Sequence, residues 1–151
     1  MTNTADRPIA AATDLAPLLL RVVLGVLVLL HGVAKVMAGP GYMMALVSKA
    51  GLPSFVAYGV YIGEVVAPLL LIAGLCTRSA AAVVAINMLF AFALVHTGDL
   101  FNLSKTGGWA LELQGLYFFT ALAVALLGAG RYSLDAVIGH RLPRPLALAA
   151  A

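Results

Sequence analysis

Long apolar stretches separated by short polar segments dominate the chain, and they predict membrane-spanning helices. About 20 mainly apolar residues cross the hydrocarbon core of a bilayer, and four stretches of the chain meet that length. They are residues 15–38, 55–75, 79–97 and 109–128. The first is too long for a cleaved secretory signal, contains Arg21 and Lys35, and lacks a small-residue cleavage pattern, so we expect it to be retained. The predicted fold class is an all-α, integral membrane four-helix bundle.

The segments between the spans differ in character. Residues 74–78 predict a tight turn, and residues 98–108 predict a polar loop. Residues 39–54 hold an apolar run bracketed by glycines and prolines, which is too short to cross a bilayer and too apolar for open water. This segment therefore predicts a short interfacial helix between spans one and two.

Both ends of the chain are expected on the same side of the membrane, because the number of predicted spans is even. Residues 1–14 and 136–151 are rich in alanine, include several prolines, and are expected to be mobile tails around a membrane domain at 15–135. The basic residues on the side of the termini are Arg7, Arg78, Arg131, Arg141 and Arg144, against Lys49 and Lys105 in the opposite loops. By the positive-inside rule, both termini are expected in the cytoplasm.

Composition narrows the classes of function. The chain is 63% hydrophobic and 10% charged, whereas a soluble domain carries roughly 25% charged residues, so a water-soluble globule is excluded and a lipid bilayer is the expected partner. The net charge of +3 comes from basic residues spread thinly along the chain, which argues against nucleic acid as a partner. Cys76 is the single cysteine, so an internal disulfide and a thiolate metal cage are excluded. Redox chemistry would therefore need a bound cofactor.

Ionisable residues inside the spans are the candidate functional groups, because a charge in hydrocarbon costs at least about 2.5 kcal/mol and needs a partner or a wet cavity. On the first span, at 100° per residue, one narrow stripe is expected to face inward. It holds Arg21, Gly25, Val28, Gly32 and Lys35, with His31 about 80° to its side. The glycines, Gly25 and Gly32, allow close approach of another helix.

On the second span, Tyr61, Glu64 and Pro68 share one face. Pro68 has no amide hydrogen for the carbonyl of residue 64, which predicts a kink and a free backbone acceptor beside the Glu64 carboxylate. Depth estimates pair Arg21 with Glu64 across spans one and two. This pair can be a buried ion pair that fixes helix register or the floor of a binding pocket, and the sequence leaves both interpretations open.

A second cluster is expected nearer the opposite surface, where His31, Lys35, His96 and Glu112 converge below the loop residues Asp99 and Asn102. It can bind a quinone head group, transfer protons through a histidine, hold a metal, or form a rim of salt bridges whose long side chains reach the headgroups. We assign no metal ligands. The cofactor is unknown: a quinone is compatible with the cluster, whereas two isolated histidines on different spans argue only weakly for haem.

Asn87 lies in the middle of the third span, about 180° around the helix from His96, so the two do not face the same neighbour. We expect Asn87 to make an interhelical hydrogen bond, as polar side chains do inside membrane bundles. Its role is therefore structural, together with Gly25, Gly32 and Pro68.

Three sequence segments carry a family resemblance. They are LLLRVVLGVLVLLHGVAKV in span one, YGVYIGEVVAPLLLIAGLCTR in span two, and GAGRYSLD after span four. Their order and spacing resemble the DoxX family of small four-helix bacterial membrane proteins, over about residues 15–135. The positions that match the family pattern are Arg21, Gly25, Gly32, Lys35, Glu64, Pro68, Arg78, Gly128, Gly130, Arg131 and Asp135.

The resemblance implies a multi-pass protein of the bacterial inner (cytoplasmic) membrane. The family takes its name from a membrane subunit of a thiosulfate:quinone oxidoreductase, and its members are linked to quinone or thiol stress and to soluble redox partners. Because paired cysteines are absent here, the resemblance does not extend to direct thiol–disulfide exchange.

The functional expectation is an integral membrane subunit of a quinone-linked redox system. Its ligand-binding residues would be Arg21, His31, Lys35, Tyr61, Glu64, His96 and Glu112. Two other classes stay open: a non-catalytic scaffold that docks a redox protein or forms a homo-oligomer through its glycine-lined faces, and, third, a small transporter, for which no inverted repeat is evident. Whether the chain is itself an enzyme is left open.

Overall fold

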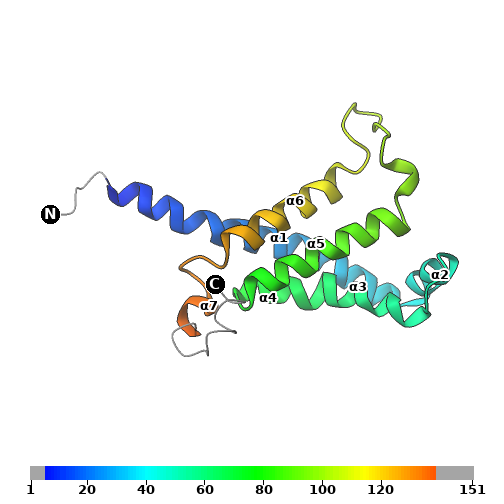
Figure 1. Ribbon diagram of the computed structural model, residues 1–151, viewed down its shortest axis with the longest axis horizontal. Coiled ribbons are helices and arrows are strands. Elements are labelled where there is room, and N and C mark those ends of the chain that lie inside the picture. The colour runs from blue at the N-terminus through cyan, green and yellow to red at the C-terminus, as the bar shows by residue number, and fades with distance from the viewer. Residues whose placement is uncertain (1–5, 139–151) are drawn as a thin grey trace.

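The structure is a computed structural model that describes residues 6–138, with side chains from Asp14 onward. Within those residues all regular structure is helical, apart from one isolated bridge between Leu103 and Trp109. The predicted all-α class is therefore confirmed. Figure 1 shows long helices running side by side, with both described ends of the chain at one end of the bundle. We call this the terminal end, and the opposite one, which carries α2 and residues 95–111, the loop end.

Helix α1 (Asp6–Ala38) is the longest element and contains the first membrane span. It begins before residue 15, so residues 6–13 continue the helix into the segment that was expected to be a tail. At the other end of the chain, a short helix, α7 (Leu134–Ile138), follows the last long helix. The remainder of the expected tails, residues 1–5 and 139–151, lies outside the described residues.

The second span is one continuous helical stretch of changing pitch. It consists of η1 (Ser54–Tyr58), α3 (Gly59–Tyr61), η2 (Ile62–Val66) and α4 (Ala67–Ala73). The middle piece, η2, is a π-helix that ends just before Pro68. Since Pro68 offers no N–H to the carbonyl of Glu64, the local widening of the helix falls where the kink was predicted, and such π-turns recur at functional sites.

Helices α5 (Thr77–Leu94) and α6 (Glu112–Leu127) form an antiparallel pair in extensive contact. Three stretches, residues 14–38, 54–73 and 77–94, are long and apolar enough to cross a membrane. Helix α6 is apolar but shorter, at 16 residues, or about 24 Å. The predicted short helix between spans one and two is present as α2 (Gly41–Lys49), and a 3-10 turn, η3 (Thr97–Asp99), follows α5.

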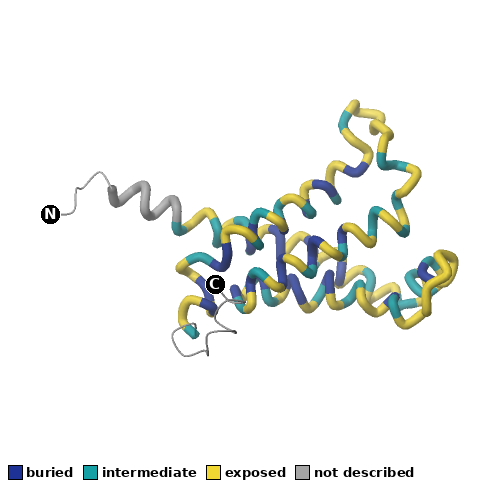
Figure 2. The backbone as a smooth tube through the Cα atoms, in the orientation of Figure 1, coloured by how far each residue is buried: buried dark blue, intermediate teal, exposed yellow. Residues whose placement is uncertain are grey.

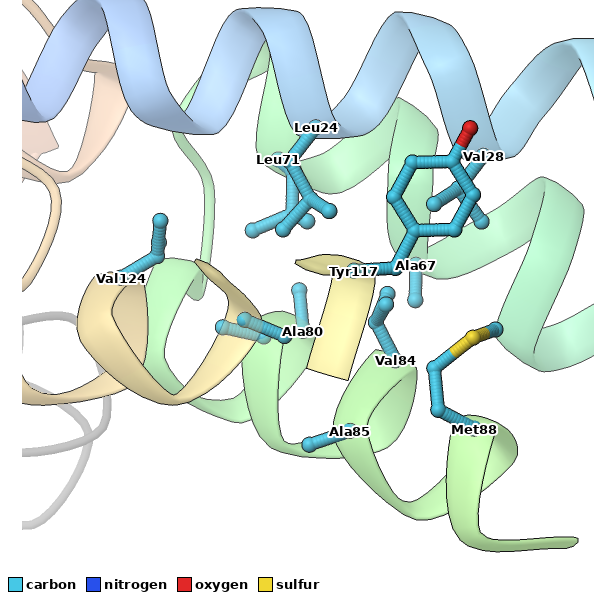
Figure 3. Packing of buried hydrophobic residues seen from close by; sticks show 12 residues of the cluster. Leu24, Val28, Ala67, Leu71, Ala80, Val84, Ala85, Met88, Tyr117 and Val124 are labelled. Atoms are coloured by element: carbon cyan, nitrogen blue, oxygen red, sulfur yellow. The ribbon is translucent and has the colours of Figure 1, made fainter. Parts of the chain in front are cut away.

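The core lies where the four long helices meet, and many of its side chains are small. Figure 3 shows Leu24 and Val28 of α1 facing Leu71 of α4, with Val84 of α5 and Tyr117 of α6 closing the cluster. Figure 2 shows that the buried positions run along the middle of the bundle, while the outer faces of the helices are exposed. Many of the exposed side chains are large and apolar, as expected for surfaces covered by lipid.

Two glycines of α1 fix how it packs against the second span. A Cβ atom at Gly25 would lie 2.9 Å from the backbone oxygen of Pro68, and one at Gly32 would overlap the backbone oxygen of Glu64. At the terminal end, a Cβ at Gly74 would lie 2.7 Å from Arg21 Nη1. The glycine faces that suggested oligomerisation are therefore used inside the chain. In this register Gly32 is level with Glu64, and Arg21 is level with Gly74.

Candidate functional site

Glu64 is the centre of a buried polar cluster built by three helices. Its Oε1 accepts hydrogen bonds from Lys35 Nζ of α1 and from Asn87 Nδ2 of α5, the latter at 3.1 Å. The Glu64 side chain is 5% exposed and the Lys35 side chain 32%. The π-helix η2 presents Glu64 toward the bundle, while Lys35 reaches it from near the loop end of α1. A carboxylate in this position is paired with one cation and one amide.

The second carboxylate oxygen of Glu64 is not satisfied. Oε2 is buried and has no hydrogen-bond partner among the described residues. Buried polar atoms normally have a partner, and an exception needs an explanation. A free, buried acceptor beside two fixed donors can receive a hydrogen bond from a ligand hydroxyl group.

Two pockets reach this cluster. The apolar pocket, about 280 Å³, lies between the second span and α5, and its only polar side chains are Lys35, Glu64 and Asn87. The polar pocket, about 230 Å³, lies between α1, α2, α5 and α6. The residues common to both are Lys35, Met43, Glu64, Ala91 and Val95. The ion pair therefore sits where an apolar and a polar cavity adjoin.

The predicted pair between Arg21 and Glu64 is wrong. Arg21 donates from Nη1 to the carbonyl oxygens of Leu71 and Ile72, each at 2.8 Å, and from Nη2 to the carbonyl oxygen of Tyr132. Glu64 lies ten residues from Gly74, about 15 Å along the helix, so Arg21 is level with the end of α4 rather than with Glu64. The last carbonyls of a helix lack intrahelical partners and carry negative partial charge, which makes them suitable acceptors for a guanidinium group.

The terminal end is closed around this arginine by the segment after α6. Asp135 accepts hydrogen bonds from the backbone N–H groups of Cys76, at 2.7 Å, and Thr77, at 2.9 Å, and from the Thr77 hydroxyl at 2.8 Å. It thereby caps the start of α5 from outside the helix. Asp135 N–H in turn donates to the carbonyl of Gly74 at 2.8 Å. Arg21 and Asp135 thus fasten the same turn, and Arg21 lines neither of the two pockets.

The predicted cluster at the loop end forms only in part. His31, Lys35 and His96 line the polar pocket together with Glu64. Glu112 lines neither pocket, and its carboxylate lies against the loop at Gly108. Asn102 donates to the carbonyl of Gly98 at 2.9 Å, and Asp99 is a neighbour of His96. In the part of the chain that the structure describes, no three His, Cys, Asp or Glu side chains are grouped to hold a metal ion.

Tyr61 also lies away from the pockets. It shares the second span with Glu64, but neither pocket includes it, and its ring packs at 6.2 Å from that of Tyr58. The pitch of η2 differs from the 100° per residue of an α-helix, so residues expected on one face of the second span are turned apart.

Three site residues were missed or underestimated from the sequence. Asn87 was assigned an interhelical role, but its partner is the carboxylate that faces the pockets. Tyr117 and Gln114 line the polar pocket beside His31 and His96. The only sequence signal for them is polarity at the start of an otherwise apolar span, which does not specify a direction around the helix.

Comparisons with known proteins concern the family of the chain. The family model described as DoxX matches residues 16–97. An uncharacterized protein of Haemophilus influenzae is 36% identical over 119 residues, covering 77% of this chain and 85% of the relative. The "Putative oxidoreductase CatD" of Bacillus subtilis is 30% identical over 122 residues, covering 81% and 86%. No solved structure gives a significant match.

Proposed function

This chain belongs to the DoxX family, and we propose that it is the membrane subunit of a quinone-linked redox system, with a site for a quinol head group at Glu64. The single observation that carries this proposal is the buried, unpartnered Oε2 of Glu64 at the junction of two pockets. The name of the Bacillus subtilis relative, an oxidoreductase, supports the redox assignment.

The site has the chemical features that a quinol needs. A hydroquinone hydroxyl donates a hydrogen bond, and Oε2 is an acceptor with no competing donor. Lys35 and Asn87 hold Oε1 and keep the carboxylate in place. When two electrons leave the quinol for a redox partner protein, a carboxylate that already accepts the hydroxyl hydrogen bond is positioned to take its proton.

The apolar pocket has the lining expected for the ring and its tail. Small-ligand sites are mostly apolar, with a few polar groups that set orientation. The walls include Val60, Ile62, Ile86 and Phe90, of which Ile62, Ile86 and Phe90 are also exposed on the outer surface. A ligand dissolved in the bilayer can therefore enter sideways between η2 and α5.

We also propose that the terminal end faces the bacterial cytoplasm, across the inner membrane. Arg78 and Arg131 lie at this end, whereas Lys49 and Lys105 lie at the loop end, which is the asymmetry that the positive-inside rule uses. Of the other arginines in that argument, Arg141 and Arg144 lie outside the described residues.

Equilibrium binding of decylubiquinol and decylubiquinone to the purified protein tests the proposal. In Glu64→Gln, the amide oxygen is held by Lys35 and Asn87, so the NH₂ group occupies the position of Oε2 and presents a donor in place of an acceptor. We expect decylubiquinol affinity to fall about tenfold or more, the loss of one good hydrogen bond, while decylubiquinone affinity is kept. Binding can be followed by quenching of Trp109, the single tryptophan.

The matched control is Glu112→Gln, which removes the same charge at the same end of the bundle outside both pockets. We expect it to bind both ligands as the parent does. Equal loss in Glu112→Gln and Glu64→Gln, or no loss in either, contradicts the proposal. A parent protein that binds neither ligand but retains a partner protein supports the scaffold alternative.

A further inference from the structure

The polar pocket differs from the apolar one in what it offers to Glu64. Beside the shared ion pair, it is lined by His31 of α1, Tyr42 of α2, His96 after α5, and Gln114 and Tyr117 of α6. The apolar pocket has no titratable group other than Lys35 and Glu64 themselves. A proton on Glu64 that left through the apolar pocket would enter hydrocarbon, where a charge is costly.

Polar contacts lead from the polar pocket to the surface of the loop end. Tyr117 Oη lies 3.4 Å from His31 Nε2, and Figure 3 shows the Tyr117 hydroxyl pointing toward α1. His96 Nε2 lies 3.3 Å from Gln114 Nε2, and His96 Nδ1 lies 3.4 Å from Asp99 Oδ2. The Asp99 side chain is 51% exposed. The two histidines thus line the same pocket as the buried carboxylate, and one of them adjoins an exposed side chain.

We propose that the polar pocket is the route by which Glu64 exchanges its proton with water at the loop end, and that His31 and His96 carry protons along it. The step is an acid–base exchange: the O–H bond on Glu64 Oε2 breaks, an N–H bond on an imidazole or an O–H bond on water forms, and no electron moves. Histidine suits this role because one ring nitrogen of a neutral imidazole can accept a proton while the other donates one. The inference rests on the proposed function for the source of the proton, the quinol hydroxyl.

The groups that influence this exchange come from every helix around the polar pocket. Lys35 is paired with Glu64 through Oε1, which leaves Oε2 as the oxygen that can exchange a proton. Tyr42 and Tyr117 are the other titratable residues of the lining, and Asp99 adjoins His96. The direction of release is therefore toward the loop end, the side opposite to Arg21.

A thiol-accessibility experiment tests the water route without any quinone. In a Cys76→Ser background, which removes the exposed native thiol, cysteine is introduced at Ala91 or Val95, which line both pockets, and the protein is placed in lipid nanodiscs. The matched control is Ala93→Cys, exposed on the same helix and lining neither pocket. The probe is the membrane-impermeant reagent sulfonatoethyl methanethiosulfonate.

We expect Ala91→Cys and Val95→Cys to react at least about tenfold faster than Ala93→Cys, because only a thiol in contact with water ionises and reacts. If Ala91→Cys and Val95→Cys both react only as fast as Ala93→Cys, the proposal is overturned. This result does not depend on a ligand, so it is distinguishable from failure of the proposed function.

The second arm measures proton release during oxidation of saturating decylubiquinol by ferricyanide, in which one quinol and two ferricyanides give one quinone, two ferrocyanides and two protons. We expect His31→Ala and His96→Ala to slow acid release about tenfold or more, and added imidazole to restore it. A structural role of the histidines would not produce rescue by imidazole. Unchanged release in both variants overturns the proposal, whereas absence of decylubiquinol binding in the parent overturns the proposed function.

Discussion

Two buried charged residues at opposite ends of the bundle differ in their hydrogen-bond partners and in their access to pockets. Arg21, at the terminal end, is 2% exposed and is held by three backbone carbonyls from α4 and the segment after α6. Glu64, toward the loop end, has partners on one oxygen only and adjoins two pockets. Within residues 14–138, Nε of Arg21 also has no hydrogen-bond partner, but Arg21 lines neither pocket. The arginine lines neither pocket, whereas Glu64 lines both.

The surroundings of the two residues distinguish a buried charge that holds chain segments together from a buried charge that lines a pocket. Both residues are ionisable and both cost free energy to bury. Arg21 donates to carbonyls at the end of α4 and to one in the segment after α6, so it fastens two chain segments. Among the described residues Glu64 Oε2 has no hydrogen-bond partner, and we propose that a ligand uses this acceptor. We therefore expect substitutions at the two ends to change different measurements.

The largest loss of stability is expected for Arg21→Met. It removes three hydrogen bonds from a charged donor, each contributing about 1.5 kcal/mol or more, so we expect a loss of about 4 kcal/mol in the free energy of unfolding in detergent. Arg21→Lys keeps the charge but cannot span three acceptors as a guanidinium group does. It should restore less than half of the free energy of unfolding that Arg21→Met loses. A change of under about 1 kcal/mol for Arg21→Met would show that the arginine is not a fastening residue.

The next largest loss is expected for Lys35→Met, which leaves a buried carboxylate with Asn87 as its single partner. Because Lys35 is one-third exposed, the loss should be about 2 to 3 kcal/mol, the low end for breaking a buried pair. The double variant Lys35→Met with Glu64→Leu removes both charges and should recover most of it. If the double variant is less stable than Lys35→Met alone, Glu64 itself stabilises the fold and the contrast with Arg21 is lost.

Gly32→Ala tests the contact that brings α1 to the level of Glu64. The new methyl group overlaps a backbone oxygen, which cannot move aside as a flexible side chain can, so we expect a loss of about 2 kcal/mol in thermal unfolding. The control is Gly59→Ala, in the second span, where no atom lies within 4 Å of the added Cβ. It should be stabilising by about 0.5 kcal/mol, as alanine is in a helix.

The smallest effect is expected for Asp135→Asn, which weakens the cap on α5 but keeps one acceptor oxygen. We expect a loss of about 1 kcal/mol with quinol binding unchanged, because the site lies at the other end. Asp99→Asn, at an exposed carboxylate, should leave the unfolding temperature of the protein where it was. A change in decylubiquinol affinity in Asp135→Asn would show that the terminal end influences ligand binding, and would contradict the independence of the two ends.

The spans could be predicted from the sequence because a long apolar stretch of about the right length crosses a bilayer as a helix. Apart from the start of the first, the predicted spans agree with the helix bounds to within three residues, and the π-helix η2 ends two residues before Pro68. The start of α1 at Asp6 could not be predicted, because no sequence signal marks how far a helix extends beyond its apolar span.

The pairing of charges could not be predicted, for two physical reasons. The acceptors of Arg21 are backbone carbonyls, which have no sequence signature, and the helix ends were assumed to lie at one depth. In the structure the register follows from Gly25 and Gly32, so Lys35, rather than Arg21, reaches Glu64. The role of Asn87 was visible as a polar residue in mid-span, but not its partner.

Photoaffinity labelling with an azidoquinone in membranes, followed by mass-spectrometric mapping of the labelled peptides, tests the central claim most directly. We expect label on the walls of the apolar pocket, within residues 56–64 and 83–95, and its loss when excess decylubiquinol competes. Label concentrated around Arg21, Gly74 and Asp135, or spread over lipid-facing positions and insensitive to competition, would contradict a head-group site at Glu64.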